Sequence, residues 1–316
     1  MKKKLLALTL ATLTVLGVTG CSNKGAAQKT PKESENKEIK LTYKDKEYTV
    51  PGSEAKLVIT GSLESFEDAL LLGVKPMGAM TVGGSFPDMF KTITGDSKAI
   101  GEKTQPNVET ILSLKPDLIL GSSKFPEETL EKLNKIAPTV PVSHIATDWE
   151  ANLILMGQLS GKEDKAKEII ANYKKDASES KEKLANSLKG KKVLAARIRA
   201  GNIAIYPANI FFNTVLYSDL GLEVPEPVAA AKAQENISLE KLSELNPDYI
   251  FLQFSEDENA DKPKALEELE SNPIWKNLNA VKNGKVFVNV VDPLAQGGTA
   301  WSKTEFLKAA VSKLSE

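Results

Sequence analysis

The sequence is poorest in the residues that metal centres and nucleophilic active sites use most. Its 316 residues include one histidine and one cysteine. Structural zinc sites, haem held by paired histidines, Cys–His nucleophiles and disulfide frameworks all need residues that this sequence lacks. The phosphate-binding patterns G-x-x-x-x-G-K-[ST] and G-x-G-x-x-G are absent as well, and no two carboxylates stand out as an acid and a base. The sequence therefore argues against an enzyme and predicts no catalytic residues, no resident metal ion and no cofactor.

Aromatic residues are also scarce, and the net charge of the chain is close to zero. Aromatic side chains make up 6% of the chain and do not alternate with basic ones, which argues against a stacking platform for nucleic acid. The 41 lysines and arginines are balanced by 42 acidic residues, so no bulk positive field attracts nucleic acid. An apolar content of 41% with 26% charge is typical of a globular protein, and the length indicates two domains or lobes.

A long apolar run occurs at the start of the chain. Lys2–Lys4 precede the apolar stretch Leu5–Val18, and small residues then lead to Cys21. A basic start followed by an apolar run of this length is typical of a secretory signal and is too short for a settled transmembrane helix. The sequence thus predicts a lipoprotein signal peptide over 1–20, a lipobox whose Cys21 is lipidated, and a polar tether over 21–38. The alternative is a soluble secreted protein with an incidental cysteine.

The remaining residues alternate between short apolar runs and amphipathic segments. Residues 39–54 read as a small β-hairpin that turns at Asp45–Lys46. The strands expected after it are Leu57–Thr60, Pro76–Thr81, Leu118–Leu120, Val193–Ile198, Tyr249–Phe254 and Val286–Val291. The helices expected between them are Phe66–Leu72, Val108–Leu114, Glu127–Ile136, Leu239–Leu245, Ala265–Leu269 and Lys303–Leu314. This alternation of apolar strands with helices predicts an α/β fold with mainly parallel sheets.

The middle of the chain follows a different pattern. Apolar residues at helical spacing run through Glu163–Leu188, and the other positions there are polar. The pattern predicts a helix of about 26 residues, which would be about 39 Å long and could join two lobes. We therefore expect two Rossmann-like lobes, at 55–160 and 191–316, with a connecting helix at 161–190.

The two lobes carry a faint repeat. Asn107–Leu120 aligns without gaps with Ser238–Phe251, and each copy has a capping residue, a two-turn helix, a Pro-Asp turn and a strand. The repeat indicates an internal duplication. Chance is the alternative, because a helix, a Pro-Asp turn and a strand form a common arrangement.

Two of the 41 basic residues are arginines, Arg197 and Arg199, and the rest are lysines. The planar guanidinium offers bidentate hydrogen bonds and a charge that does not titrate. Both arginines end the apolar run that begins at Val193, and residues two apart on a strand point to the same face. Ligands of open α/β sheets bind beyond the carboxyl ends of strands, so the pair is a candidate binding site. A structural ion pair with a carboxylate is the alternative.

Lysines are expected on the same side of both lobes. Lys124 follows the third expected strand of the first lobe, Lys103 precedes a helix of that lobe, and Lys232 precedes the matching helix of the second lobe. Each lysine alone would be an ordinary surface amine, but together they predict a basic cleft between the lobes. Residues Gln296–Trp301 are expected to border this cleft.

Taken together, these features resemble the helical-backbone solute-binding lipoproteins of iron-siderophore ABC importers. The stretches that carry the resemblance are Phe86–Phe90, Lys124–Glu127, Pro141–Ile145, Arg197–Arg199, Ala231–Glu235, Gln253–Pro263 and Asp292–Lys303. They are most similar to the FeuA-type receptors of Gram-positive bacteria for ferric bacillibactin and enterobactin, and they cover the chain from about residue 39 to its end. The resemblance implies the fold of class III, or cluster A, periplasmic binding proteins.

The resemblance also implies a ligand, a ferric tris-catecholate that carries three negative charges. The positions that match the basic cluster of such receptors, together with a neutral partner, are Lys103, Lys124, Arg197, Arg199, Lys232 and Gln234. Iron would be held by the oxygens of the siderophore, so the protein would need neither metal ligands nor a cofactor.

The same resemblance implies partners. In the family, one acidic residue on each lobe pairs with arginines of the membrane permease, and Glu109 and Glu240 occupy these places. A charge favourable to the start of a helix is their alternative role. A monomer is expected, anchored by its lipid to the outer face of the cytoplasmic membrane of a Gram-positive bacterium. The chain departs from the pattern at Ala200, where relatives have glutamine, and near Ser85, where they have lysine; these losses would weaken or redirect the choice among catecholates.

Three other functions fit less of the sequence. The same fold could bind a hydroxamate siderophore, haem or cobalamin, but hydroxamate complexes carry too little negative charge to suit a cationic cleft. An extracellular hydrolase would need a G-x-S-x-G elbow followed by a histidine, and this arrangement is absent. His144 can form neither a triad nor a two-histidine metal site, so a structural role is expected for it. An adhesion or structural lipoprotein is the third alternative, and unchanged uptake in a double mutant of Arg197 and Arg199 would favour it.

Overall fold

The computed structural model describes residues 38–52 and 55–316, which belong to one compact unit. The predicted signal peptide, the lipidation site Cys21 and all but the last residue of the predicted tether lie outside the described residues. Within the described ranges, no helix is both long and apolar enough to cross a membrane.

The described chain starts with the hairpin of β1 (Ile39–Tyr43) and β2 (Lys46–Val50). Lys44 and Asp45, both with positive φ, form its turn, one residue earlier than the sequence predicts. The hydroxyl of Tyr43 fastens the hairpin to the first lobe, because it donates to Oδ1 of Asn152 at 2.6 Å and accepts from the N–H of Ser143 at 2.7 Å.

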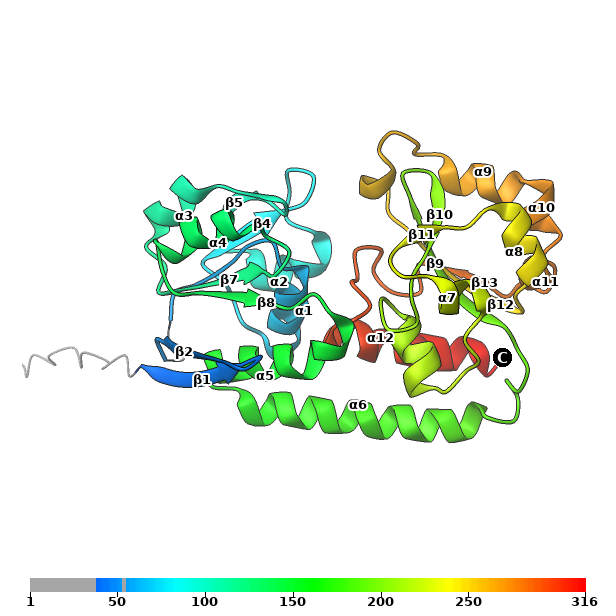
Figure 1. Ribbon diagram of the computed structural model, residues 1–316, viewed down its shortest axis with the longest axis horizontal. Coiled ribbons are helices and arrows are strands. Elements are labelled where there is room, and N and C mark those ends of the chain that lie inside the picture. Colours follow the sequence, from blue (N-terminus) through cyan, green and yellow to red (C-terminus); the bar gives the residue numbers. More distant parts are fainter. Residues whose placement is uncertain (1–37, 53–54) are drawn as a thin grey trace, which may run out of the picture. The chain divides into compact units, whose positions relative to one another are not determined.

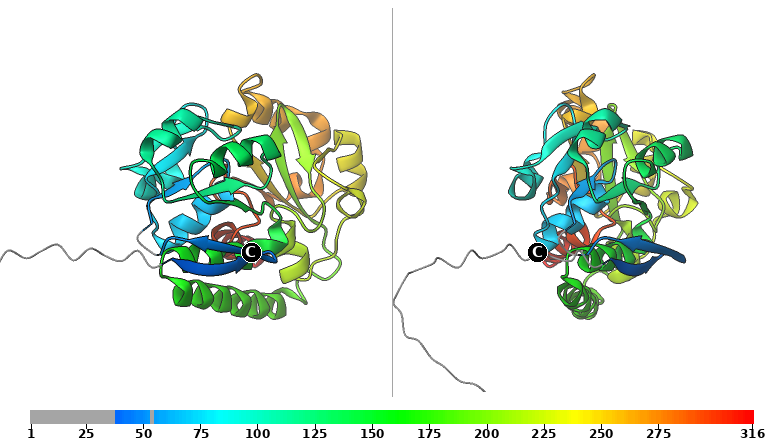
Figure 2. Two further views of the ribbon diagram at one scale, coloured as in Figure 1. Left: turned by 60° about the vertical axis from the view of Figure 1, so that its left-hand side comes forward. Right: turned by 90° about the vertical axis from the view of Figure 1, so that its left-hand side faces the viewer.

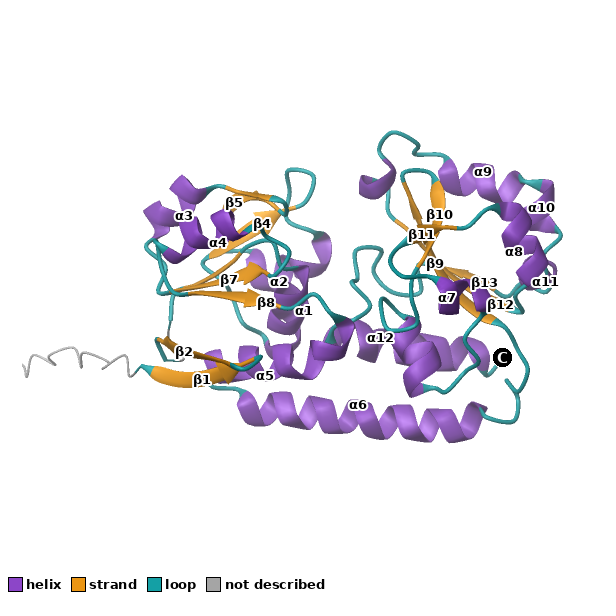
Figure 3. Ribbon diagram, viewed as in Figure 1, coloured by secondary structure: helices purple, strands orange, loops and turns teal. Residues whose placement is uncertain are grey.

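The first lobe is built around a six-stranded sheet with the order β6-β5-β4-β3-β7-β8 (Figures 1 and 3). Its strands are β3 (Leu57–Ile59), β4 (Gly78–Thr81), β5 (Lys98–Glu102), β6 (Gln105–Pro106), β7 (Leu118–Ser122) and β8 (Thr139–Val142). Its helical segments are α1 (Leu63–Leu72), η1 (Asp88–Phe90), α2 (Lys91–Thr94), α3 (Val108–Leu114) and α4 (Glu127–Asn134). Neighbouring strands are parallel except for β5 with β6. Strand β3 is apolar throughout because both of its faces are covered: Val58 packs in one core cluster and Ile59 in another.

The second lobe contains a five-stranded sheet with the order β11-β10-β9-β12-β13. Its strands are β9 (Val193–Arg199), β10 (Asn202–Ile205), β11 (Glu235–Asn236), β12 (Tyr249–Phe254) and β13 (Val286–Val288). Its helical segments are the π-helical η3 (Thr214–Asp219), α7 (Glu226–Ala230), α8 (Leu239–Leu245), η4 (Asp257–Asn259), α9 (Ala265–Ser271), α10 (Pro273–Lys276) and α11 (Asn279–Lys282). The predicted strands β9, β12 and β13 are parallel, whereas β10 and β11, which the sequence did not predict, add an antiparallel edge.

The predicted repeat is present in atomic detail. Asn107 and Ser238 cap α3 and α8 by accepting from the N–H three residues further on, at 3.0 and 3.2 Å. The residue after each helix has a left-handed φ, of 50° and 45°. Asp117 and Asp248 then each accept a hydrogen bond at 2.9 Å from the N–H that precedes the neighbouring parallel strand, β3 or β9. The two units therefore share their caps, their turns and the bonds that join them to their sheets.

Helix α6 (Glu163–Leu184) joins the lobes, and α5 (Trp149–Leu159) and α12 (Ala300–Leu314) pack against it. Helix α6 runs along α5 and α12 on the side away from α3 and α8 (Figures 1 and 2). It has 22 residues, or about 33 Å, because the chain leaves the helix at Ala185, before the predicted end at Leu188. The C-terminal α12 also packs against α1 of the first lobe.

A buried lysine fixes α12 within this layer. The Nζ atom of Lys303 lies 2.7 Å from Oδ2 of Asp219 and 3.1 Å from Oγ1 of Thr214. The rings of Trp149 and Tyr173 cover the amine, and Tyr173 donates to the same Asp219 oxygen at 2.5 Å. Burial lowers the pKa of Lys303, and the pairing with Asp219 opposes that shift. These contacts join α5, α6, α12 and the second lobe at one point.

Candidate binding cleft

A cleft of about 400 Å³ lies between the lobes. The residues of the first lobe and α5 that line it are Glu64, Lys124, Ser143, His144, Ile145, Ala146 and Asn152. The residues that follow α6 and line it are Arg197, Arg199, Tyr206, Ile210, Phe211, Lys232, Ala233, Gln234, Gln296 and Gly298. The cleft includes the loops at the carboxyl ends of β7 and β9, where the sequence predicts a ligand site, and the loop after β8, a strand that the sequence did not predict.

The arginine pair lies at the end of β9, as the sequence predicts. The side chain of Arg197 is 6% exposed and that of Arg199 is 44% exposed. Nη2 of Arg197 donates to the carbonyl of Pro293 at 2.9 Å, and its guanidinium carbon lies 5.9 Å from the ring centroid of Phe211. Arg197 is therefore held on several sides, whereas Arg199 is open to the cleft.

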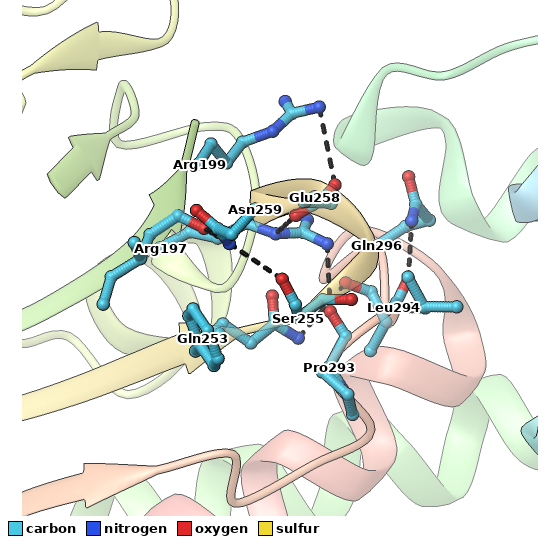
Figure 4. A network of polar contacts seen from close by, with 12 residues as sticks. Arg197, Arg199, Gln253, Ser255, Glu258, Asn259, Pro293, Leu294 and Gln296 are labelled. Atoms are coloured by element: carbon cyan, nitrogen blue, oxygen red, sulfur yellow. Dashed lines mark hydrogen bonds and ion pairs between the residues drawn. The ribbon is translucent and has the colours of Figure 1, made fainter. Parts of the chain in front are cut away.

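A carboxylate bridges the two arginines (Figure 4). Oε2 of Glu258 lies 2.6 Å from Nε of Arg197, and Oε1 lies 3.4 Å from Nη2 of Arg199. Glu258 belongs to η4, which follows β12, the strand next to β9. Glu258 was not predicted from the sequence, although its place after a predicted strand is a usable signal. The arginines therefore form the structural ion pair that was the alternative to a binding site. They also line the cleft, so the two interpretations are compatible.

Gln234 gives Arg199 a neutral partner. Its Oε1 accepts from Nη1 of Arg199 at 2.7 Å and from the hydroxyl of Tyr206 at 3.1 Å. Burial raises the pKa of Tyr206, so the phenol keeps its proton and remains a donor. Both acceptor directions of the amide oxygen are therefore used, and the Nε2 amide group of Gln234 remains as a donor.

The three predicted lysines differ in position. Lys124 and Lys232 are exposed and line the cleft. Lys103 is half-buried and lies outside the cleft lining, but its charge interacts with the cleft. Burial lowers the pKa of Lys103, and the charges of Lys124 and Arg197 lower it further. Glu64, a buried carboxylate on the cleft wall, acts in the opposite direction.

The single histidine lies in the cleft, where the sequence gave it only a structural role. Nδ1 of His144 is 2.9 Å from Oγ of Ser123. Burial lowers the pKa of His144 and the charge of Lys124 lowers it further, so the ring is mostly neutral at pH 7. Beside it, Ile145 is a large apolar side chain left 38% exposed, and Phe211 lines the opposite wall. The cleft therefore combines cations with apolar surface.

Glu67 on α1 holds one border of the cleft. It accepts a hydrogen bond from the N–H of Gln296 at 2.8 Å and others from the hydroxyls of Thr299 and Ser302. Burial raises the pKa of Glu67 to about 7, although these three hydrogen bonds act in the opposite direction. Gln296 lines the cleft, as predicted, and a helix of the first lobe fixes its position.

The two predicted docking residues lie outside the cleft lining. Glu109 and Glu240 are the second residues of α3 and α8, and both are exposed. The two helices belong to different lobes (Figure 1).

A second hollow, of about 500 Å³ between the hairpin, α5 and α6, also contains lysines. Each of these lysines is already paired with a carboxylate, in the pairs Lys44–Asp148, Lys167–Glu163 and Lys174–Glu150. Its positive charge is compensated, which makes it a poorer anion site than the cleft.

The model of the periplasmic binding protein family matches residues 58–289. The chain belongs to this family. The predicted fold class, two α/β lobes joined by a long helix, is that of periplasmic binding proteins and is confirmed.

Individual periplasmic binding proteins are similar over nearly the whole chain. The iron-uptake system-binding protein of Bacillus subtilis is 55% identical over 317 residues, with 100% of both chains covered. The structure of the triscatecholate siderophore binding protein FeuA from Bacillus subtilis, complexed with ferri-bacillibactin, has 59% identity and a TM-score of 0.83 and covers 88% of this chain and 98% of its own. SirA of Staphylococcus aureus, complexed with staphyloferrin B, has 27% identity and a TM-score of 0.72 with the same coverage. The chain is accordingly a binding protein and not an enzyme.

Proposed function

We propose that the protein binds a ferric tris-catecholate siderophore in the cleft and delivers it to the permease of an ABC importer. The charge of the cleft is the observation that supports this most directly. Lys124, Arg197, Arg199 and Lys232 line it, with Lys103 just outside the lining, and the negative groups beside them include Glu64, Glu258 and Glu235, whose carboxylate accepts from the N–H of Lys232. The positive groups outnumber these negative ones, and a ferric tris-catecholate carries the opposite charge. Similarity to a protein whose structure holds ferri-bacillibactin supports the same ligand class.

The chemistry of the cleft walls suits such a ligand. Catecholate oxygens accept charge-assisted hydrogen bonds from the open guanidinium of Arg199 and from the lysines, and a partly desolvated cleft strengthens them. The amide of Gln234 donates to the same oxygens. The exposed side chain of Ile145 provides apolar contact for the catechol rings. Because the siderophore supplies all ligands of the iron, the protein needs neither a metal site nor a cofactor.

The remaining parts of the proposal concern delivery. Cys21, once lipidated, would hold the protein as a monomer at the outer face of the cytoplasmic membrane of a Gram-positive bacterium, since several acyl chains give firm anchoring. Glu109 and Glu240 would then meet arginines of the permease, one from each lobe.

Isothermal titration calorimetry on a chain that begins after Cys21 tests the binding step, because this chain retains the whole compact unit Asn36–Glu316. Tight binding of a ferric tris-catecholate and little binding of a ferric hydroxamate are expected. Arg199→Ala should weaken catecholate binding at least tenfold, or by about 1.4 kcal/mol. Lys276→Ala, which removes an exposed cation on α10, should leave the affinity within about twofold.

Equal affinity for the two iron complexes would contradict the charge-matched cleft and favour another ligand of the same fold. Indifference to Arg199→Ala would contradict the assigned site even if the catecholate binds.

A further inference from the structure

Glu258 lies behind the arginine pair rather than on the cleft surface, and its side chain is 20% exposed. Figure 4 shows its carboxylate between the two guanidinium groups. A carboxylate in this place lowers the positive charge that an anion meets. Since its charge opposes anion binding, its contribution to a binding site has to come from geometry.

The segment that carries Glu258 is fixed to the end of β9. The carbonyl of Glu258 accepts from the N–H of Ala200 at 3.1 Å. The next residue, Asn259, is buried; its Nδ2 donates to the carbonyls of Ile198 and Ser255 at 2.9 and 2.8 Å, and its Oδ1 accepts from the N–H of Gly201 at 3.0 Å. The carboxylate is thus anchored through its backbone on both sides of the strand end that bears the arginines.

The two arginines use this anchor unequally. Arg197 has the short contact to Glu258, the carbonyl of Pro293 and the ring of Phe211, so its guanidinium has little freedom. Arg199 has the longer contact to Glu258 and the neutral partner Gln234, and its side chain is 44% exposed. Arg197 is therefore immobilised. Arg199 is the exposed hydrogen-bond donor, and Glu258 and Gln234 together set the direction of its guanidinium group.

We propose that Glu258 is a positioning residue for anion binding: it fixes Arg197 and orients Arg199 toward the cleft, so that the bound anion dissociates slowly despite the negative charge behind it. This inference rests on the proposed function, because it assumes that the cleft binds an anionic ferric complex. Preorganisation of this kind lowers the cost of ordering side chains on binding.

Stopped-flow measurements on the chain that begins after Cys21 separate geometry from charge. Glu258→Gln removes one negative charge, so association with a ferric tris-catecholate should stay the same or rise up to about threefold at low salt. Dissociation should accelerate at least tenfold, because the arginines lose their anchor. The matched control, Glu256→Gln, makes the same charge change at an exposed position two residues away, and its dissociation rate should change less than twofold.

Slower or unchanged dissociation in Glu258→Gln would overturn the proposal, since the carboxylate would then act only as an opposing charge. If Glu258→Gln does not fold, Glu258→Asp replaces it, because this variant keeps the charge and shortens the side chain. Faster dissociation of Glu258→Asp with unchanged association would support the proposal. Unchanged dissociation would overturn it. Absence of tris-catecholate binding by the unaltered chain would instead contradict the proposed function.

Discussion

Arg199 donates a hydrogen bond from Nη1 to Oε1 of Gln234 at 2.7 Å, which joins the end of β9 to the segment before β11. This partner is neutral, and the carboxylate contact of Arg199, to Glu258 at 3.4 Å, is longer than the 2.6 Å contact between Glu258 and Arg197. A neutral acceptor holds a guanidinium in place without cancelling its charge. Arg199 therefore keeps the charge that an anionic ligand needs.

Gln234→Glu should weaken binding of a ferric tris-catecholate at least tenfold, because the new carboxylate would neutralise Arg199 and remove the amide donor. The matched control is Asn236→Asp, the same change from amide to carboxylate two residues further along in the exposed strand β11. Calorimetric affinities for the two variants should differ by about 1 kcal/mol or more. Equal losses would mean that only the net charge of the region matters.

Glu67→Gln should change how stability depends on pH. Burial raises the pKa of Glu67 from 4.5 to about 7, so between these values the folded protein holds a proton that the unfolded chain has released. Stability then falls as pH rises through this window, because the native state binds more protons. Asp68, whose pKa burial also raises, acts in the same direction and remains in the variant. Removing the Glu67 contribution should lessen the loss between pH 5 and 7 by on the order of 2 kcal/mol.

Urea unfolding at pH 5, 6 and 7 measures this slope. Glu128→Gln is the control, because Lys132 lowers the pKa of this exposed carboxyl from its usual value and the group is mostly ionised throughout the window. Parallel stability profiles for the unaltered chain and Glu67→Gln would show that Glu67 stays ionised in the folded protein.

Ala200→Asn should stabilise the fold by about 1 kcal/mol. Ala200 and Gly201 form the two-residue turn between β9 and β10 and have φ of 46° and 76°. Two positive φ values suit Asn-Gly, whereas alanine is strained there. The same substitution at Ala229, an exposed residue of α7, should instead cost about 0.5 kcal/mol through helix propensity. Equal losses of unfolding free energy at both positions would exclude strain at Ala200.

The sequence predicts an element correctly where residues close to its two ends signal its start and its end. Helices α3 and α8 begin and end as expected, because Asn107 and Ser238 cap them and a Pro-Asp turn follows. Helix α1 begins at Leu63, three residues before the predicted start, and its polar residues are buried. A pattern that treats carboxylates as exposed cannot find such a helix, because Glu67 is buried by partners more than 200 residues away.

The site could be predicted in the same way only in part. Arg197, Arg199 and Lys124 were candidates because the two arginines end one strand and the lysine follows another, and strand ends meet at a ligand-binding edge. The roles of Glu258 and His144 depend on which loops fold beside β9 and β7. Their contact partners, Arg197 and Ser123, are distant in the sequence, so no local pattern predicts these contacts. The sequence therefore predicts where the cations lie, and the structure supplies what orients them.

The double variant Glu109→Lys and Glu240→Lys should separate binding from delivery. Both residues are exposed at the starts of α3 and α8 on different lobes, outside the cleft lining, so calorimetric affinity for a ferric tris-catecholate should stay within about twofold. Each reversed charge costs up to about 1 kcal/mol at a helix start, which leaves the protein folded. Cellular uptake of iron from the siderophore should fall at least tenfold, because like charges would then face the permease. Glu244→Lys, an exposed position later in α8, should leave uptake unchanged. Normal uptake by the double variant would exclude these two residues from docking and leave the cleft untouched.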